Sequence, residues 1–254
     1  MNVICDIDGV VYRGDTVVPG SDRALRKLIA SGATLYFATN NSTKSPSTVS
    51  EKISRITGVD VPPESIVTSS QAAVLLLAAD PGPVLVLGSD GILSALADAG
   101  IPVTENPREA TALLVGLDWD FSYERLTRAA DAVRAGARFI ATNTDPTYPV
   151  VGGLLPGGGS MVAAIAATTG VMPEVAGKPH EPMRRLLRSR GVDTAWVIGD
   201  RADTDVALAR AEPGWTSILV LSGVTGPDGG DQADHVVPDL EAAVDLVLAA
   251  GHQR

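Results

Sequence analysis

The segment Asn2-Val3-Ile4-Cys5-Asp6-Ile7-Asp8-Gly9 contains the residues from which the fold can be inferred. Its first half is a short apolar run, typical of a buried strand, and two carboxylates follow where that strand ends. Asp6 and Asp8 point the same way while the backbone stays extended, and Gly9 permits a sharp turn. Two like charges this close repel each other unless a cation intervenes, which suits a carboxylate nucleophile, a neighbouring acid or base and a divalent metal. A plain turn after a strand is the alternative, because aspartate is common in turns.

Beyond this segment, short apolar runs alternate with longer amphipathic segments along the whole chain. The first pattern predicts strands and the second predicts helices. We expect strands near residues 33–38, 65–68, 84–87, 112–115, 139–141, 196–198, 218–221 and 235–237, and helices near 21–31, 46–56, 70–78, 91–99, 123–135, 160–168, 181–190, 203–211 and 240–249. Aliphatic strands that alternate with helices predict an α/β fold with parallel sheets, whose functional residues follow the carboxyl ends of the strands.

Composition narrows the class of protein. The chain of 254 residues has room for one or two domains, and its formal net charge of −10 argues against a partner that is nucleic acid or an anionic membrane. The single cysteine, Cys5, excludes an internal disulfide and a cysteine zinc site, and we expect it to be buried. No apolar run is long enough to span a bilayer and no leader-like segment opens the chain, so we expect a cytoplasmic protein.

Two further motifs follow predicted strands or precede predicted helices. Thr39-Asn40-Asn41-Ser42 offers a hydroxyl and backbone N–H groups that can hold phosphate oxygens, although capping of the next helix is an alternative. Gly177-Lys178-Pro179-His180 places a lysine before a helix. That lysine is either a point charge between a carboxylate and a phosphate or a solvated surface residue.

The fourth motif, residues 199–205, contains Asp200 at a strand end and Asp203 and Asp205 at the start of the next helix. Mg²⁺ prefers hard oxygen ligands and usually takes one or two protein carboxylates together with water and phosphate. Asp205 therefore either binds a metal directly or orients its water ligands. Acids that favour the helix dipole are the alternative interpretation.

The four motifs, in this order, resemble those of the haloacid dehalogenase (HAD) phosphatases, and most closely the NagD-like subclass IIA. Residues 2–10, 136–143 and 218–224 are similar to that subclass in detail, and the resemblance covers essentially the whole chain.

The resemblance implies a Rossmann-like core with a parallel sheet and a large inserted α/β cap. The core would consist of residues 1–79 and 177–254, and the cap of residues 80–176. The strands that precede Asp6, Thr39 and Asp200 would lie side by side in the core sheet. Caps in this family can mediate dimers, so the resemblance leaves a homodimer through the cap open.

The resemblance also implies roles for particular residues. Asp6 would attack phosphorus, and Asp8 would protonate the leaving group and then accept a proton from water. The Asp6 carboxylate, the Asp8 backbone carbonyl and Asp200 would bind Mg²⁺, with Asp205 in support.

The remaining roles concern the phosphate. Thr39 and the backbone of Asn40, together with Asn41, would bind the phosphoryl oxygens, and Lys178 would balance charge. Asp8 favours a phosphatase, because dehalogenases of this family lack a second catalytic aspartate.

The implied function is Mg²⁺-dependent hydrolysis of small soluble phosphate monoesters. The family's substrates include sugar and glycerol phosphates, nucleoside monophosphates and p-nitrophenyl phosphate, so the expected partner is a small phosphorylated metabolite. An oxidoreductase that binds a dinucleotide would need G-x-G-x-x-G after the first strand, where this chain has Asp6-Ile7-Asp8-Gly9. A phosphate-binding regulatory module without catalysis would be expected to lack the nucleophile or the lysine, and both are present.

Substrate choice is expected to lie in the cap. The segment that contains Asn143, Asp145 and Tyr148 is similar to the specificity loop of the subclass. Asn143 and Asp145 either shape this loop or contact the substrate, and shaping is favoured because both residue types are common in turns. We interpret the glycines at 157–159 as a turn before a helix, and Trp119 and Trp215 as residues that pack in a core or in a loop.

Overall fold

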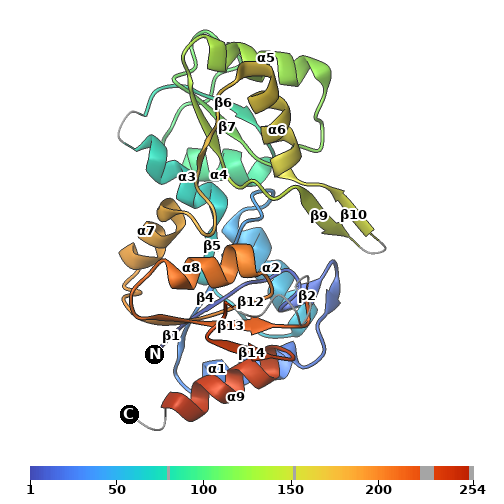
Figure 1. The fold of residues 1–254 in the computed structure, drawn as a ribbon, viewed down its shortest axis with the longest axis vertical. Coiled ribbons are helices and arrows are strands. Elements are labelled where there is room, and N and C mark those ends of the chain that lie inside the picture. Colours follow the sequence, from blue (N-terminus) through green and yellow to red (C-terminus); the bar gives the residue numbers. More distant parts are fainter. Residues whose placement is uncertain (79–80, 151–152, 224–231, 252–254) are drawn as a thin grey trace. The chain divides into compact units, whose positions relative to one another are not determined.

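The computed structural model describes residues 1–78, 81–150, 153–223 and 232–251. The chain folds into two compact units (Figure 1). The first unit consists of Met1–Thr39, Pro46–Val67 and Leu187–Arg254, and the second of Asn40–Ser45 and Thr68–Leu186. The predicted cap, residues 80–176, falls inside the range of the second unit, while its predicted start at residues 79–80 lies outside the described residues. Its assignment as a cap stays a prediction.

The first unit is built on a six-stranded sheet in the order β14-β13-β12-β1-β4-β5. These strands are β1 (Asn2–Cys5), β4 (Thr34–Thr39), β5 (Ile66–Thr68), β12 (Ala195–Gly199), β13 (Trp215–Val220) and β14 (His235–Val237). β1 is parallel to both neighbours, and Cys5 is in register with Phe37 of β4 and Ile198 of β12. The prediction that the strands before Asp6, Thr39 and Asp200 are neighbours is confirmed.

The helices of this unit are α1 (Ser21–Ala30), α2 (Pro46–Thr57), α8 (Ala207–Arg210), α9 (Leu240–Gly251) and the end of α7 (Glu181–Ser189). α1 and α9 lie side by side (Figure 1), and an ion pair of 2.7 Å joins Arg23 to Glu241 at their exposed edge. Their inner faces pack on the sheet in a core of aliphatic side chains around Phe37, and Cys5 is buried there as expected. Burial of this apolar surface supplies most of the stabilisation, and it holds the strand ends in place.

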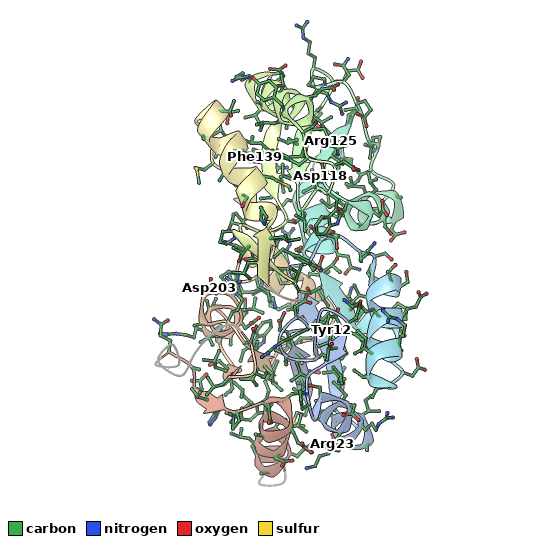
Figure 2. All side chains as sticks on the ribbon, turned by 90° about the vertical axis from the view of Figure 1, so that its right-hand side faces the viewer. Tyr12, Arg23, Asp118, Arg125, Phe139 and Asp203 are labelled. Atoms are coloured by element: carbon green, nitrogen blue, oxygen red, sulfur yellow. The ribbon has the colours of Figure 1, made fainter. Side chains whose placement is uncertain are left out.

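The second unit contains a four-stranded parallel sheet in the order β11-β8-β7-β6. Its strands are β6 (Val84–Leu87), β7 (Ala112–Val115), β8 (Arg138–Ala141) and β11 (Glu174–Val175), and its helices are α3 (Ser69–Leu77), α4 (Asp90–Asp98), α5 (Tyr123–Arg134) and α6 (Gly158–Thr169). This unit has a separate apolar core, in which Phe139 lies (Figure 2). The predicted α/β class with parallel sheets is therefore confirmed.

Two short hairpins were not predicted. β2 (Tyr12–Arg13) pairs with β3 (Thr16–Val17), and β9 (Thr147–Val150) pairs with β10 (Gly153–Pro156). The first pair is too short to show a period, and prolines and glycines mask the second. Within the described residues, no helix is long and apolar enough to cross a membrane.

Two predicted helix starts were wrong. Gly158 and Gly159 belong to α6 rather than to a turn. Glycine is needed at 159 because a side chain there would overlap the backbone of Thr144. The predicted helix at 203–211 begins instead as the π-helical turn η2 (Ala202–Val206) and continues as α8.

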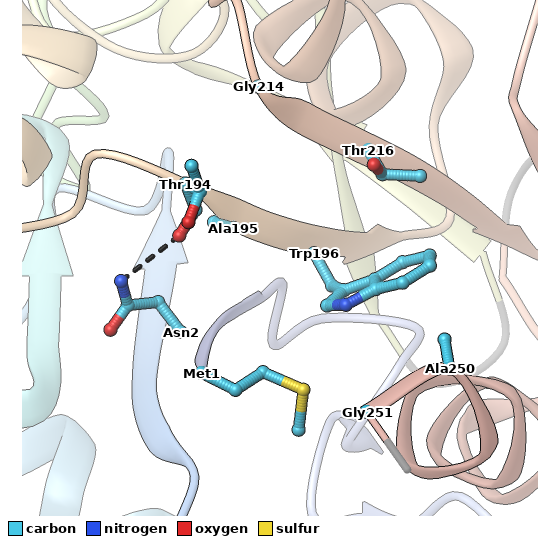
Figure 3. A pocket seen from close by; sticks show the side chains of 9 residues that line it. All are labelled: Met1, Asn2, Thr194, Ala195, Trp196, Gly214, Thr216, Ala250 and Gly251. Carbon is cyan, nitrogen blue, oxygen red and sulfur yellow. Dashed lines mark hydrogen bonds between the residues drawn. The ribbon is translucent and has the colours of Figure 1, made fainter. Parts of the chain in front are cut away.

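A cavity of about 440 Å³ opens at the amino end of the first sheet (Figure 3). Asn2 and Trp196 line it, and the Asn2 side chain donates a hydrogen bond of 3.0 Å to the carbonyl oxygen of Thr194. Since Asp6 and Asp200 follow the opposite ends of the same strands, this cavity is separate from the acidic residues described next.

Candidate active site

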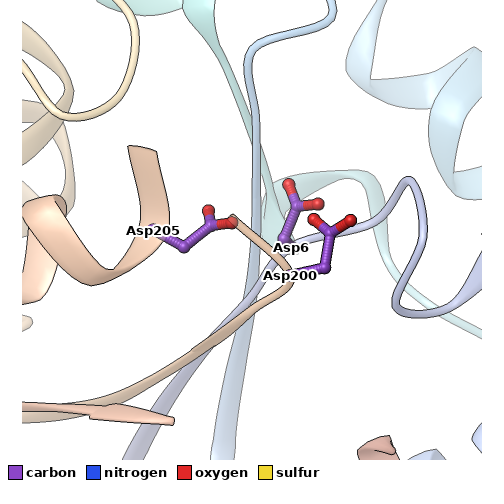
Figure 4. A group of neighbouring side chains, drawn as sticks. All are labelled: Asp6, Asp200 and Asp205. Atoms are coloured by element: carbon purple, nitrogen blue, oxygen red, sulfur yellow. The ribbon is translucent and has the colours of Figure 1, made fainter. Parts of the chain in front are cut away.

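Three aspartates come together at the carboxyl edge of the first sheet (Figure 4). Asp6 follows β1, Asp200 follows β12 and Asp205 lies in η2. One carboxylate oxygen from each lies within 4.8 Å of the other two, and Asp200 and Asp205 are buried. Three anionic groups at this spacing repel one another, so the cluster is stabilised by any cation that binds between them.

Glycines allow the backbone to enclose these carboxylates. Gly9 has a φ of 88°, and a Cβ built on it would come within 2.5 Å of Asp200 Oδ2. A Cβ at Gly223 would also overlap Asp200, and one at Gly199 would overlap Asp205. The result is a close-fitting arrangement of hard oxygen donors, which is the donor type that Mg²⁺ prefers. The residues present therefore fit this metal.

Asp8 lies in the tight turn that follows Asp6. The N–H of Val11 donates to the carbonyl of Ile7 at 2.8 Å, and that of Gly9 donates to the carbonyl of Tyr12 at 2.8 Å. The turn places Asp8 three residues beyond the end of β1, in a bridge with Tyr12. Among the described residues, the carboxylate group consists of Asp6, Asp200 and Asp205, so Asp8 does not contribute its side chain to it.

Asp203, the remaining acid of this motif, lies outside the group that Asp6, Asp200 and Asp205 form among the described residues. The Arg201 guanidinium donates to both Asp203 oxygens, at 3.1 and 2.8 Å, and this hydrogen bonding lowers the pKa of the exposed Asp203 carboxyl. The backbone N–H of Arg201 instead donates to Asp205 Oδ2 at 3.1 Å. The π-helical turn thus presents Asp205 to the interior and Asp203 to solvent.

The predicted phosphate-binding motif begins at the buried Thr39, the last residue of β4, and continues into the second unit. The Asn41 carboxamide oxygen accepts hydrogen bonds from the N–H and the hydroxyl of Thr43, at 2.9 and 2.7 Å. This bonding shapes the turn after Asn41, in keeping with the alternative role of asparagine in local structure.

Asn40 lies in a network within the second unit. Its Oδ1 accepts the N–H of Lys178 at 2.7 Å, and its Nδ2 donates to the Lys178 carbonyl and to Asp145 Oδ2, both at 3.2 Å. Lys178 is buried, which excludes the alternative of a solvated surface lysine. Partial desolvation and the neighbouring Arg184 lower the pKa of His180, which lies exposed to solvent just before α7.

The predicted specificity loop starts after β8. Asn143 is buried, and its Oδ1 accepts the N–H of Asp145 at 3.0 Å, a local bond that shapes the loop. Tyr148 lies in β9, and its ring meets that of Trp119 edge-on, with centroids 5.7 Å apart.

Trp119 packs against Tyr148 but does not lie in a core, whereas Trp215 is buried. Trp119 is 57% exposed and lines a cavity of about 350 Å³ in the second unit. An exposed tryptophan beside a cavity is typical of a binding surface.

Comparison with known proteins places the chain in a family. A model of haloacid dehalogenase-like hydrolases matches residues 3–102, and a HAD-hydrolase-like model matches residues 175–243. An acid sugar phosphatase from Staphylococcus aureus is 38% identical over 228 residues, which cover 87% of this chain and 86% of the relative. The chain belongs to the haloacid dehalogenase-like hydrolases.

Solved structures of other HAD-like hydrolases are similar over nearly the whole chain. A glycerol phosphate phosphatase from Mycobacterium tuberculosis, solved in complex with magnesium, is 34% identical with a TM-score of 0.87, and the match covers 95% of this chain and 75% of that one. NagD from E. coli K-12 is 31% identical with a TM-score of 0.85, and the match covers 94% and 96% of the two chains. The resemblance to the NagD-like subclass is therefore confirmed.

Proposed function

We propose that this HAD-like hydrolase is a Mg²⁺-dependent phosphatase that acts on small phosphate monoesters. The observation that carries the proposal is the group of Asp6, Asp200 and Asp205 at neighbouring strand ends. The names of the similar acid sugar phosphatase and glycerol phosphate phosphatase support it.

In the proposed reaction, a carboxylate oxygen of Asp6 attacks phosphorus and the bond from phosphorus to the ester oxygen breaks. Asp8 gives its proton to the leaving alkoxide, so an alcohol departs and an aspartyl-phosphate is left on Asp6. A water molecule then attacks this phosphorus and passes a proton to Asp8. Inorganic phosphate leaves and both aspartates return to their starting states.

The metal would be held by the carboxylates of Asp6 and Asp200 and the backbone carbonyl of Asp8, with Asp205 in support. When bound, Mg²⁺ supplies positive charge that offsets the phosphate and the carboxylates. Thr39 and the main chain of Asn40 and Asn41 would hold the phosphoryl oxygens. The ammonium group of Lys178 would add a second positive charge, since phosphoryl transfer is catalysed mainly by positioning and electrostatics.

The alternative is a phosphate-binding regulatory module without catalysis. Release of inorganic phosphate distinguishes the two, because a binding module would retain phosphate esters intact. The wild-type protein is expected to release phosphate from sugar phosphates, glycerol phosphate, nucleoside monophosphates or p-nitrophenyl phosphate in the presence of Mg²⁺. Colorimetric phosphate detection across such a panel, compared by kcat/KM, is the test. Hydrolysis of none of the panel would contradict a phosphatase.

Substrate preference is proposed to depend on Trp119 and Tyr148. The cavity beside Trp119 carries more carboxylates than cations, including Asp90, Glu105 and Asp120, so it favours a neutral polyhydroxylated group over a second anion. Hydroxyls can hydrogen-bond to these carboxylates while the apolar face of a sugar lies against the indole.

Changing this aromatic pair is therefore expected to alter selectivity more than chemistry. Trp119→Ala or Tyr148→Ala should raise KM for sugar phosphates roughly tenfold and leave kcat/KM for acetyl phosphate nearly unchanged. Tyr123→Ala is the control, because this ring is 85% exposed in the same unit. Equal losses on both substrates would count against a specificity role.

Two further expectations remain predictions: a cytoplasmic location and a homodimer formed through the predicted cap, residues 80–176. Sedimentation velocity of the wild-type protein tests the second, and a monomer at all concentrations would exclude it.

A further inference from the structure

The side chain of Asn40 bonds to both main-chain polar groups of Lys178. The Lys178 N–H donates to Asn40 Oδ1 at 2.7 Å, and Asn40 Nδ2 donates to the Lys178 carbonyl at 3.2 Å. One carboxamide thus bonds to both the N–H and the carbonyl of Lys178, as the main chain of a neighbouring strand would in a sheet. It holds the backbone from which the buried Lys178 side chain extends.

The same carboxamide reaches the predicted specificity loop. Asn40 Nδ2 also donates to Asp145 Oδ2 at 3.2 Å, and the Asn143 side chain donates to the carbonyl of Asn40 at 2.7 Å. The hydroxyl of Ser69 donates to that carbonyl as well, at 2.7 Å. Asn40 is thus fixed from both ends by residues that lie 29 to 138 positions away in the sequence.

Gly177 supplies an independent observation. A Cβ at this position would overlap Asn40 Oδ1 and come within 2.5 Å of the carbonyl oxygen of Thr142. The chain before Lys178 must therefore lie directly against the Asn40 carboxamide, and only glycine permits this approach. The glycine before Lys178 is explained by its packing on Asn40.

We propose that the Asn40 side chain is a positioning residue that fixes Lys178 and couples it to the loop carrying Asn143 and Asp145. The proposal rests on the phosphatase function proposed above. It gives the side chain a role different from the phosphate contact expected of the Asn40 main chain. A substrate that moves the loop would move Lys178 through this one carboxamide.

The sharpest variant is Asn40→Asp, which has nearly the same shape. A carboxylate can still accept the Lys178 N–H, but it cannot donate to the Lys178 carbonyl or to Asp145. It would also place like charges about 3 Å apart. We expect kcat to fall roughly 10²-fold with little change in KM, because a small displacement of a catalytic group affects the chemical step.

A polarity swap tests the coupling to the loop. In the double variant Asn40→Asp with Asp145→Asn, the new carboxamide can donate to the new carboxylate, so the 40–145 contact is restored in reverse. We expect kcat to recover about tenfold from the single variant. A role in folding alone would change melting temperature without this kcat-specific rescue. Asn106→Asp is the matched control, since Asn106 makes exposed side-chain hydrogen bonds to Glu109 and Arg108 in the same unit.

The outcomes separate this proposal from the phosphatase function. If the wild-type protein is active and Asn40→Asp keeps the wild-type kcat, with or without a change in KM, the positioning role is wrong while the phosphatase function stands. If Asn40→Asp does not fold, Asp145→Ala carries the test, with an expected kcat loss of roughly tenfold and an unchanged far-UV spectrum. Wild-type kcat in that folded variant would also overturn the coupling.

Discussion

Asp6→Asn is expected to lower kcat for every phosphate ester by at least ~10⁴-fold, because the variant has no carboxylate to form the aspartyl-phosphate. Asparagine has nearly the same volume, so the strand end and the core behind it should remain folded. Removal of one of three neighbouring carboxylates also relieves repulsion within the cluster. We therefore expect a melting temperature in the absence of metal at or above that of the wild type. Steady-state phosphate release and thermal unfolding check the two statements.

Asp203→Asn is the matched control for this variant. Asp203 has the same chemistry and lies near the cluster in sequence, but its carboxylate bonds to Arg201 and faces solvent. Asp203→Asn should retain nearly full kcat, because this carboxylate lies outside the group formed by Asp6, Asp200 and Asp205. It should also stay folded, because an exposed ion pair contributes little to stability. Near-normal turnover in Asp6→Asn, or an equal loss in Asp203→Asn, would contradict the assignment of the nucleophile.

Asp200→Asn is expected to weaken Mg²⁺ binding and to lower kcat by roughly 10²-fold or more, because a metal is worth several kcal/mol of charge stabilisation. Asp200 is buried against Gly9 and Gly223, which leaves no space for another side chain to replace its oxygen. A readout independent of activity is the stabilisation of the fold by metal. Mg²⁺ at about 100 times its Kd should raise the unfolding free energy of the wild type by about 2.7 kcal/mol.

The variant should lose most of this stabilisation at the same Mg²⁺ concentration. Chelation with EDTA should likewise remove both the activity and the stabilisation of the wild type, and added Mg²⁺ should restore them. A wild-type protein that stays fully active after exhaustive chelation, or an Asp200→Asn variant with an unchanged Mg²⁺ response, would contradict the metal site.

The strand ends could be predicted from the sequence because their signal is local. An aliphatic run followed by a polar residue, as at Cys5-Asp6 and Gly199-Asp200, identifies both the strand and its carboxyl end. Parallel pairing then brings such residues to one edge of a sheet. This reasoning is sufficient to expect Asp6, Thr39 and Asp200 at one edge of a sheet. That their strands are neighbours was implied by the resemblance to the HAD phosphatases, and the sheet order confirms it.

Other features depend on tertiary contacts that carry no local signal. The bonds from Asn40 reach Asp145 and Lys178, which lie 105 and 138 positions away, and the sequence around Asn40 indicates only a possible cap or phosphate site. Trp119 is a large aromatic residue of a type that is usually buried, and neither its exposure nor its contact with Tyr148 of β9 has a local sequence signal. The sequence likewise gives no sign of the close packing at Gly177 and Gly223, because that packing depends on the residues that lie against each glycine.

The most direct test of the account is to identify the residue that carries phosphate during turnover. Wild-type protein would be mixed with Mg²⁺ and an accepted phosphate ester, quenched within the first turnovers and reduced with borohydride. This treatment converts an aspartyl-phosphate to homoserine, which peptide mass spectrometry can locate. We expect homoserine at position 6 and unmodified aspartate at positions 8, 200 and 205. A turnover burst with unmodified Asp6, or homoserine at another position, would contradict the proposed mechanism.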